Sequence, residues 1–337
     1  NIRELILPLM ERLFMELIIF IIGLTALLIG SYTDLQKREV ADWVNYGLIF
    51  TGFGVSLILS IVLRNYAIIV GSIIGFLIML GFGCLMFYTG QWGGGDSKML
   101  MGLGALVGLP ITFSTTFLSS IKETFSLWAG FPFLLSFLIL SIIVGAFYGL
   151  FWSIGLAIIH RKKFLPDFKK RLSTKLAQVV KIILLICALT AIVITLFSNN
   201  VIFKVFPIGV VIIFILSFYM FYFIQSIEKI AMIQFVNPEK LTEGDWISKD
   251  IYVNAGKENA GKTSAKNMKT KKQYLCGPKD LGISKEQIAK LIKLKKSGKY
   301  TKKIEIKVGI PFVPSFLIAY LITYFIGIGW LLRFILF

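Results

Sequence analysis

Histidine and cysteine, which supply most catalytic bases and metal ligands, are scarce in this 337-residue chain. It has one histidine, His160, and three cysteines, none of which forms a CxxC pair. A thiolate zinc site needs closely spaced cysteines, and a Ser/His/Asp triad needs a histidine beside a nucleophile. His160 instead opens a basic run at the end of an apolar segment. The sequence therefore predicts no metal site, no cofactor and no histidine-based catalysis.

Charged residues are also few. They make up 16% of the chain, whereas apolar and aromatic residues reach 56% and the mean hydropathy is +0.80. An ordinary soluble domain is about 45–50% apolar and about 25% charged. The apolar residues lie in blocks of about 20, the length of a helix that crosses a hydrocarbon core. This pattern excludes a soluble enzyme, a disordered chain and an outer-membrane barrel, whose strands alternate.

We therefore expect an all-α polytopic membrane protein with about eight transmembrane helices and a small α+β cytoplasmic insert. The apolar blocks lie near residues 16–32, 40–62, 68–88, 99–118, 131–159, 177–197, 201–225 and 310–337. Pairs of glycines at GxxxG spacing let helices approach closely, and we expect packing to be the only role of each pair. They occur at Gly71/Gly75, Gly104/Gly108 and Gly145/Gly149.

The distribution of bases predicts the orientation. The chain has 36 Lys and Arg against 18 Asp and Glu, a net charge of +18. With the amino terminus outside, the bases concentrate in cytoplasmic loops, as the positive-inside rule requires. The exceptions are Arg3, Arg12, Arg64, Lys122, Lys204 and Arg333. The charge is then explained by topology and by attraction to anionic membrane lipids, and it does not call for nucleic acid.

The chain is predicted to divide into six parts. They are an amino-terminal surface segment or cloning remnant (1–15), a catalytic membrane core (16–160), a basic interfacial segment (161–176), an additional helical hairpin (177–226), a cytoplasmic insert (227–309) and a carboxyl-terminal transmembrane helix (310–337). The interfacial segment has Phe164, Phe168 and Leu172 on one side and bases on the other, which is typical of a helix at a lipid surface.

The insert combines a linker with folded signals. Its stretch from Asn254 to Lys272 is polar and rich in lysine, as linkers are. Ser284 and Gln287 predict a capping box at the start of a helix, which Gly298 closes. Residues 303–308 alternate charged and apolar side chains, a pattern typical of a half-buried strand.

Two aspartates stand apart from the acids in soluble loops. Asp34 ends the first apolar block, and Asp96 follows Gly93, Gly94 and Gly95. Two predicted spans separate them, so both aspartates lie at the same, cytoplasmic face. Two carboxyl groups brought together in a poorly hydrated site cannot both ionise easily, and one keeps a proton. The ionised group can activate water while the protonated one polarises the scissile amide, as in aspartic peptidases.

Simpler explanations stay open for these residues. Asp34 can be a polar residue at the membrane interface, and Asp96 can cap the helix that starts near Lys98. Intramembrane aspartates also carry protons or cations in transporters, and basic loops can make a scaffold that binds partners. No convincing internal repeat supports a transporter, and both aspartates lie at span ends rather than at the midplane. Peptidase chemistry is therefore preferred.

The two motifs resemble those of the type IV prepilin peptidases, including the archaeal preflagellin peptidases. Residues 93–96, GGGD, have the family's GxGD form, and residues 34–42, DLQKREVAD, resemble its first aspartate motif, with Ala41 replacing a proline. The likeness is strongest over residues 16–110 and extends to residues 307–327, KVGIPFVPSFLIAYLITYFIG. It implies that Asp34 and Asp96 are the catalytic pair.

The resemblance also implies the substrates. The family cleaves class III signal peptides of prepilins and preflagellins, which have a short basic leader before a hydrophobic helix, at the cytoplasmic membrane face. Because a basic leader approaches a face rich in bases, Glu39 and Asp42 are candidates for leader recognition, although exposed acids are more often only solvated. Glycine beside Asp96 is expected to let a substrate backbone come near. Without CxxC pairs, the N-methyltransferase activity of many bacterial members is not expected.

Overall fold

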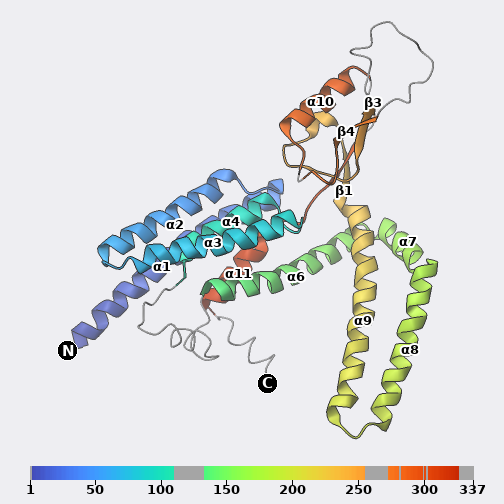
Figure 1. Ribbon diagram of the computed structural model, residues 1–337, viewed down its shortest axis with the longest axis horizontal. Coiled ribbons are helices and arrows are strands. Elements are labelled where there is room, and N and C mark those ends of the chain that lie inside the picture. The colour runs from blue at the N-terminus through green and yellow to red at the C-terminus, as the bar shows by residue number, and fades with distance from the viewer. Residues whose placement is uncertain are drawn as a thin grey trace. The chain divides into compact units, whose positions relative to one another are not determined.

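The computed structural model describes residues 2–109, 133–254, 272–280, 282–298, 300 and 303–325 (Figure 1). Contacts divide the chain into two compact units, Asn1–Leu150 with Gly309–Phe337, and Phe151–Val308. The carboxyl-terminal helix thus belongs to the same unit as the first four helices. The boundary between these units falls inside helix α6 (Phe133–Ile159), and the division into six parts stays a prediction.

The first unit is a helical assembly. Besides the first part of α6, it contains α1 (Ile2–Lys37), α2 (Asp42–Val62), α3 (Ala67–Tyr88), α4 (Gly94–Val107) and α11 (Val313–Phe325). Helix α4 packs against both α2 and α3, while α11 packs against α1 (Figure 1). Helix α1 is continuous from its first residue, so the segment 1–15 is not separated from the first apolar block by a helix end.

Six helices are long and apolar enough to cross a membrane. They are Phe14–Lys37, Asp42–Val62, Ala67–Tyr88, Phe133–Ile159, Lys175–Phe197 and Lys204–Met232. The polytopic helical class is confirmed. The described residues contain six such helices, so the expected number of about eight is not confirmed. The end of the predicted span 310–337 lies outside the described residues.

Helix α4 is shorter than the predicted span 99–118. It ends at Val107, because Gly108 adopts a left-handed φ of +64°, which is open to glycine. The N–H of Leu109 then donates to the carbonyl oxygen of Gly71 in α3 at 2.9 Å. Residues 110–118 of that predicted span lie outside the described residues.

Glycine brings α3 and α4 together backbone to backbone. A Cβ added at Gly75 would lie 2.6 Å from the carbonyl oxygen of Gly104, and one at Gly104 would lie 2.6 Å from that of Gly75. The GxxxG pairs of these two helices therefore face each other, which confirms the packing role predicted for them. In α6, Gly145 instead faces the ring of Phe312.

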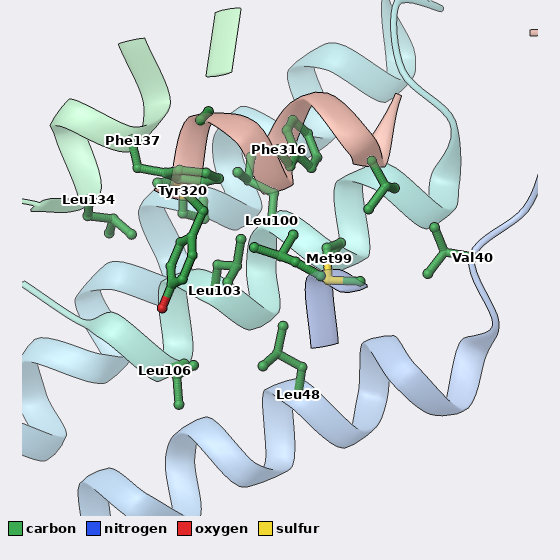
Figure 2. Packing of buried hydrophobic residues seen from close by; sticks show 14 of the residues in the cluster. Val40, Leu48, Met99, Leu100, Leu103, Leu106, Leu134, Phe137, Phe316 and Tyr320 are labelled. Atoms are coloured by element: carbon green, nitrogen blue, oxygen red, sulfur yellow. The ribbon is translucent and has the colours of Figure 1, made fainter. Parts of the chain in front are cut away.

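The core of the first unit lies where α11 meets α4 and α6. Figure 2 shows Phe316 and Tyr320 of α11 among Leu100 and Leu103 of α4 and Phe137 of α6, all fully buried. The rings of Phe137 and Phe316 meet edge to face, with centroids 6.1 Å apart. Interlocking packing of this kind, rather than exclusion of water, holds helices together in lipid.

The second unit contains a helical hairpin and the predicted α+β module. The hairpin consists of α8 (Lys175–Phe197) and α9 (Val201–Ile227), preceded by α7 (Arg161–Leu172). The apolar side of α7 packs on protein, because Phe164 stacks on Phe168 at 5.4 Å between ring centroids and meets Phe223 of α9 edge to face. The predicted interfacial segment is therefore a helix whose phenylalanines contact α9.

Asp167 fastens α7 to α9. Its carboxylate accepts hydrogen bonds from Arg171 at 2.7 Å, from Lys229 at 2.6 Å and from Ser226 at 3.1 Å. Although burial opposes ionisation, these hydrogen bonds lower the pKa of Asp167 to about 2.

The α+β module is built from short elements. They are β1 (Ile233–Val236), β2 (Trp246–Ile247), β3 (Ile251–Asn254), β4 (Lys272–Cys276), α10 (Lys285–Lys296) and β5 (Ile304–Lys307). An antiparallel sheet has the order β1-β5-β2, and β3 pairs with β4. The capping box of Ser284 and Gln287 and the strand within residues 303–308 are confirmed. The predicted linker lies almost wholly outside the described residues.

Glycine substitutions test the contact between α3 and α4. We expect Gly75→Ala to lower the free energy of unfolding by about 1–3 kcal/mol, because its Cβ meets the backbone of Gly104. Gly81→Ala lies in the same helix with nothing within 4 Å of its Cβ, so it should leave stability unchanged or raise it slightly. Thermal unfolding in detergent measures both. Equal effects of the two substitutions would show that close backbone contact is not what stabilises this pair.

Candidate active site

Asp34 lies near the carboxyl end of α1 and is buried, with 4% of its surface exposed. Its Oδ2 accepts a hydrogen bond from the backbone N–H of Val313 at 3.0 Å, a contact between residues 279 positions apart. Val313 is the first residue of α11. The first N–H groups of a helix have no acceptor within the helix and carry partial positive charge, so a carboxylate is favourable there. Asp34 therefore supplies the acceptor for the start of α11.

Arg38 makes a second contact between the same two segments. Its backbone has a left-handed φ of +61° and ends α1, with its N–H bonded to the carbonyl oxygen of Asp34 at 2.9 Å. Its guanidinium donates to the carbonyl oxygen of Gly309 at 3.4 Å, and its positive charge acts on the Asp34 carboxylate. The lead-in to α11 is thus held to the end of α1 at two points.

Asp96 is the third residue of α4. Its Oδ2 accepts a hydrogen bond from the backbone N–H of Gly93 at 3.0 Å, which closes the start of the helix. The helix begins at Gly94, earlier than the start near Lys98 that the sequence suggested, so Asp96 lies inside the first turn rather than at the N-cap. The next side chain, Ser97, donates to the carbonyl oxygen of Gly83 in α3 at 3.0 Å. These contacts fix Asp96 against α3.

The charge of Asp34 acts on Asp96. Asp96 precedes the apolar part of α4 and lies outside the six candidate membrane spans. Burial and, second, the charge of Asp34 raise the pKa of Asp96 from 3.8 to about 7, against a smaller opposite effect of the Gly93 N–H. A carboxyl group with such a pKa can either give or take a proton near neutral pH.

The glycines before Asp96 meet protein. A Cβ at Gly95 would lie 3.1 Å from the Cβ of Val40, and one at Gly94 would lie 3.6 Å from the ring of Phe87. Gly95 therefore lets the start of α4 approach the loop that follows α1, the loop next to Asp34. The approach of a substrate backbone to Gly93, Gly94 and Gly95 stays a prediction.

The candidate leader-binding acids lie in and beside this loop. Asp42 begins α2, and its side chain is 68% exposed although it pairs with the Lys98 ammonium at 2.7 Å. That ammonium also lies over the ring of Tyr46, 5.0 Å from its centroid. Glu39 is exposed in the loop before α2. The structure thus gives Asp42 an ion pair between α2 and α4, and leader recognition by either acid stays a prediction.

Some residues of the site escaped sequence reasoning. Val313 acts through its backbone N–H, which leaves no trace in the side-chain pattern. Ser31 in α1 and Asn45 in α2 are buried, and no hydrogen bond reaches the Ser31 hydroxyl or the Asn45 amide among the described residues. Their positions, one helical turn from Asp34 and from Asp42, are what could have pointed to them in the sequence. Within the described residues, no group of three or more His, Cys, Asp or Glu is arranged to hold a metal ion.

The stretch that holds both aspartates is similar to a known protein family. Residues 21–125, which contain both Asp34 and Asp96, match the model described as the type IV leader peptidase family. This part of the chain is thus similar to the type IV leader peptidases. The chain is 44% identical over 88 residues to a preflagellin peptidase of Methanococcus maripaludis and 42% identical over 93 residues to one of Methanocaldococcus jannaschii.

The likeness covers only part of each protein. The matches extend over 26% of this chain, and over 38% and 37% of the Methanococcus and Methanocaldococcus proteins. The chain thus spans less than two fifths of the curated relatives that it matches. The leader peptidase likeness includes α2, α3, α4 and about half of α1, and it does not reach α11 or the α+β module.

The pKa of Asp96 predicts how stability depends on pH. Its folded-state pKa of about 7 exceeds the ordinary 3.8, so ionisation of Asp96 opposes folding. The stability that it contributes is fully present below about pH 4 and is lost as the pH rises through about 7. We expect Asp96→Asn to reduce the fall in melting temperature between about pH 5 and pH 8. Asp42→Asn, at an exposed position, should leave the wild-type fall unchanged. Equal falls in all three proteins would contradict a raised pKa of Asp96.

Proposed function

We propose that this protein is a membrane aspartyl endopeptidase that removes class III signal peptides from archaeal prepilins or preflagellins at the cytoplasmic membrane face. The observation that carries the proposal is a pair of aspartates, the buried Asp34 and the half-buried Asp96, within the stretch that matches the leader peptidase family. The charge of Asp34 acts on Asp96. The preflagellin peptidase names of the relatives support the substrate class.

The chemistry needs no group beyond the two carboxyls and water. One aspartate, ionised, takes a proton from a water molecule, whose oxygen attacks the scissile carbonyl carbon. The other aspartate, which is protonated, gives its proton to the developing oxyanion. As the tetrahedral intermediate collapses, the aspartate that took the proton from water gives it to the leaving amine. The amide bond is replaced by a carboxyl group and an amino group. A pKa of about 7 suits Asp96 for either part of this exchange.

The position of the site fits a substrate that leaves the bilayer. Asp34 lies one turn from the end of the candidate membrane helix Phe14–Lys37. A precursor has a basic leader followed by an apolar helix, so its cleavage site lies where the chain passes from water into lipid. With the orientation predicted from the distribution of bases, that end of α1 faces the cytoplasm.

Substitution of the aspartates tests the proposal. Asp34→Asn and Asp96→Asn should each reduce cleavage of a preflagellin or prepilin at least about a thousandfold, because one carboxyl cannot act as base and acid together. Cleavage by the purified proteins in detergent is followed by mass spectrometry, and size-exclusion profiles check folding. Glu286→Gln in the exposed first turn of α10 is the control and should cleave normally. A well-folded Asn variant with near-normal turnover would remove that aspartate from the mechanism.

The candidate leader-binding acids are tested by changing charge on both sides. Glu39→Gln with Asp42→Asn should raise KM for a precursor with a basic leader severalfold, since each exposed ion pair contributes about 0.2–1 kcal/mol. A precursor whose leader has been made neutral should show little change. Lys98→Met is the companion variant, because it also breaks the Asp42 ion pair while leaving the acid in place. Equal effects on basic and neutral leaders would show that the two acids are only solvated.

A further inference from the structure

The contact between Asp34 and α11 is shielded from water. Val313 is fully buried, as are the neighbouring α11 residues Phe316 and Tyr320. A hydrogen bond to a charged group is strengthened in such surroundings, and a buried carboxylate that loses its donor stays uncompensated. The state of Asp34 is therefore sensitive to the backbone N–H groups at the start of α11, that of Val313 first and that of Phe312 to a smaller extent.

The start of α11 is itself held rigidly. The N–H and the hydroxyl of Ser315 both donate to the carbonyl oxygen of Phe312, at 2.9 and 2.6 Å. The ring of Phe312 packs against Trp92 and against Phe316, with ring centroids 5.3 Å apart in both cases. The Val313 N–H is thus presented to Asp34 by a fixed turn.

The two aspartates have different electrostatic partners. Asp34 faces the amino end of a second helix and the charge of Arg38. Asp96 accepts its backbone hydrogen bond from Gly93, within its own helical turn. Ser97 beside Asp96 is neutral and bonded to Gly83, and Lys98 is paired with Asp42. The positive end of a helix that comes from elsewhere in the chain therefore acts on Asp34 alone.

We propose that the amino terminus of α11 is a positioning element that keeps Asp34 ionised and oriented through the Val313 N–H, so that Asp34 serves as the base and Asp96 as the acid. This assignment rests on the proposed endopeptidase function. It gives the carboxyl-terminal helix, which lies outside the stretch that matches the leader peptidase family, a role in the reaction. Val313 is a positioning residue, because it acts through Asp34.

Val313→Pro removes the N–H at the first helical position, where proline is well tolerated. Val313→Ala is the matched control, because it keeps the N–H and removes most of the side chain. We expect Val313→Pro to lower kcat at least about tenfold with KM within about twofold, and to move the acidic limb of the pH profile of kcat upward by about one unit. Val313→Ala should keep the limb at the wild-type pH.

A second variant, in which an ester replaces the amide bond between residues 312 and 313, tests the same point if the proline variant does not fold. Cell-free translation with the α-hydroxy analogue of valine replaces the N–H by oxygen and leaves the side chain intact. It should reproduce the shift of the acidic limb. Identical limbs in the ester, Val313→Ala and wild-type proteins would overturn the proposal.

Labelling of carboxyl groups tests the same contact without activity. A hydrophobic carbodiimide reacts with protonated carboxyls, and mass spectrometry of peptides reports Asp34 and Asp96 separately. The pH midpoint for labelling of Asp34 should rise by about one unit in Val313→Pro or the ester, relative to Val313→Ala. Asp96 is the internal reference and should change less. If the wild-type protein cleaves no precursor, the proposed function fails, while unchanged labelling midpoints for Asp34 would refute the role of α11 by themselves.

Discussion

Backbone contact between α3 and α4 is the constraint on which the candidate site depends. Gly75 and Gly104 let the two helices approach so closely that a side chain at either position would clash with the backbone of the facing helix. Gly52 of α2 likewise lies against the backbone of Leu106 in α4. Helix α4 is thereby wedged between α2 and α3, with Asp96 in its first turn. Where Gly95 meets Val40, the start of α4 reaches the loop that follows Asp34. In lipid, where apolar surface gains nothing by leaving the solvent, close contact between small residues is what fixes helices relative to one another.

Removal of carboxyl groups from water is costly unless each has hydrogen-bond donors, and in this assembly Asp34 is buried and Asp96 half-buried. Here the donors are backbone N–H groups at the starts of two helices, Val313 for Asp34 and Gly93 for Asp96. Helix starts offer donors that no intrahelical acceptor uses, and the positive charge of Arg38 adds to their effect on Asp34. This arrangement leaves the carboxyls able to exchange protons, whereas Asp167, which binds Lys229 and Arg171, is held ionised with a pKa of about 2.

The features that could be predicted from the sequence are those that depend on the type and spacing of side chains. Apolar blocks of membrane length predicted α2 and α3 closely, and the capping box of Ser284 predicted the start of α10. The candidate aspartates followed from their places at span ends and from the GGGD motif. The end of α4 was missed, because Gly108 was read only as a packing residue although it also stops the helix. The bond from Val313 to Asp34 could not be predicted, since a backbone N–H has no sequence signature and its partner is 279 residues away.

Mass measurement of the cleavage products tests the central claim most directly. Purified protein would be incubated with an archaeal preflagellin or prepilin in detergent or in liposomes, alongside the variant that carries both Asp34→Asn and Asp96→Asn. The account predicts a free leader and a mature chain whose masses add up to the precursor plus one water, and an intact precursor with the double variant. A precursor that stays intact with the wild-type protein, or that is cut equally by the double variant, would contradict the account.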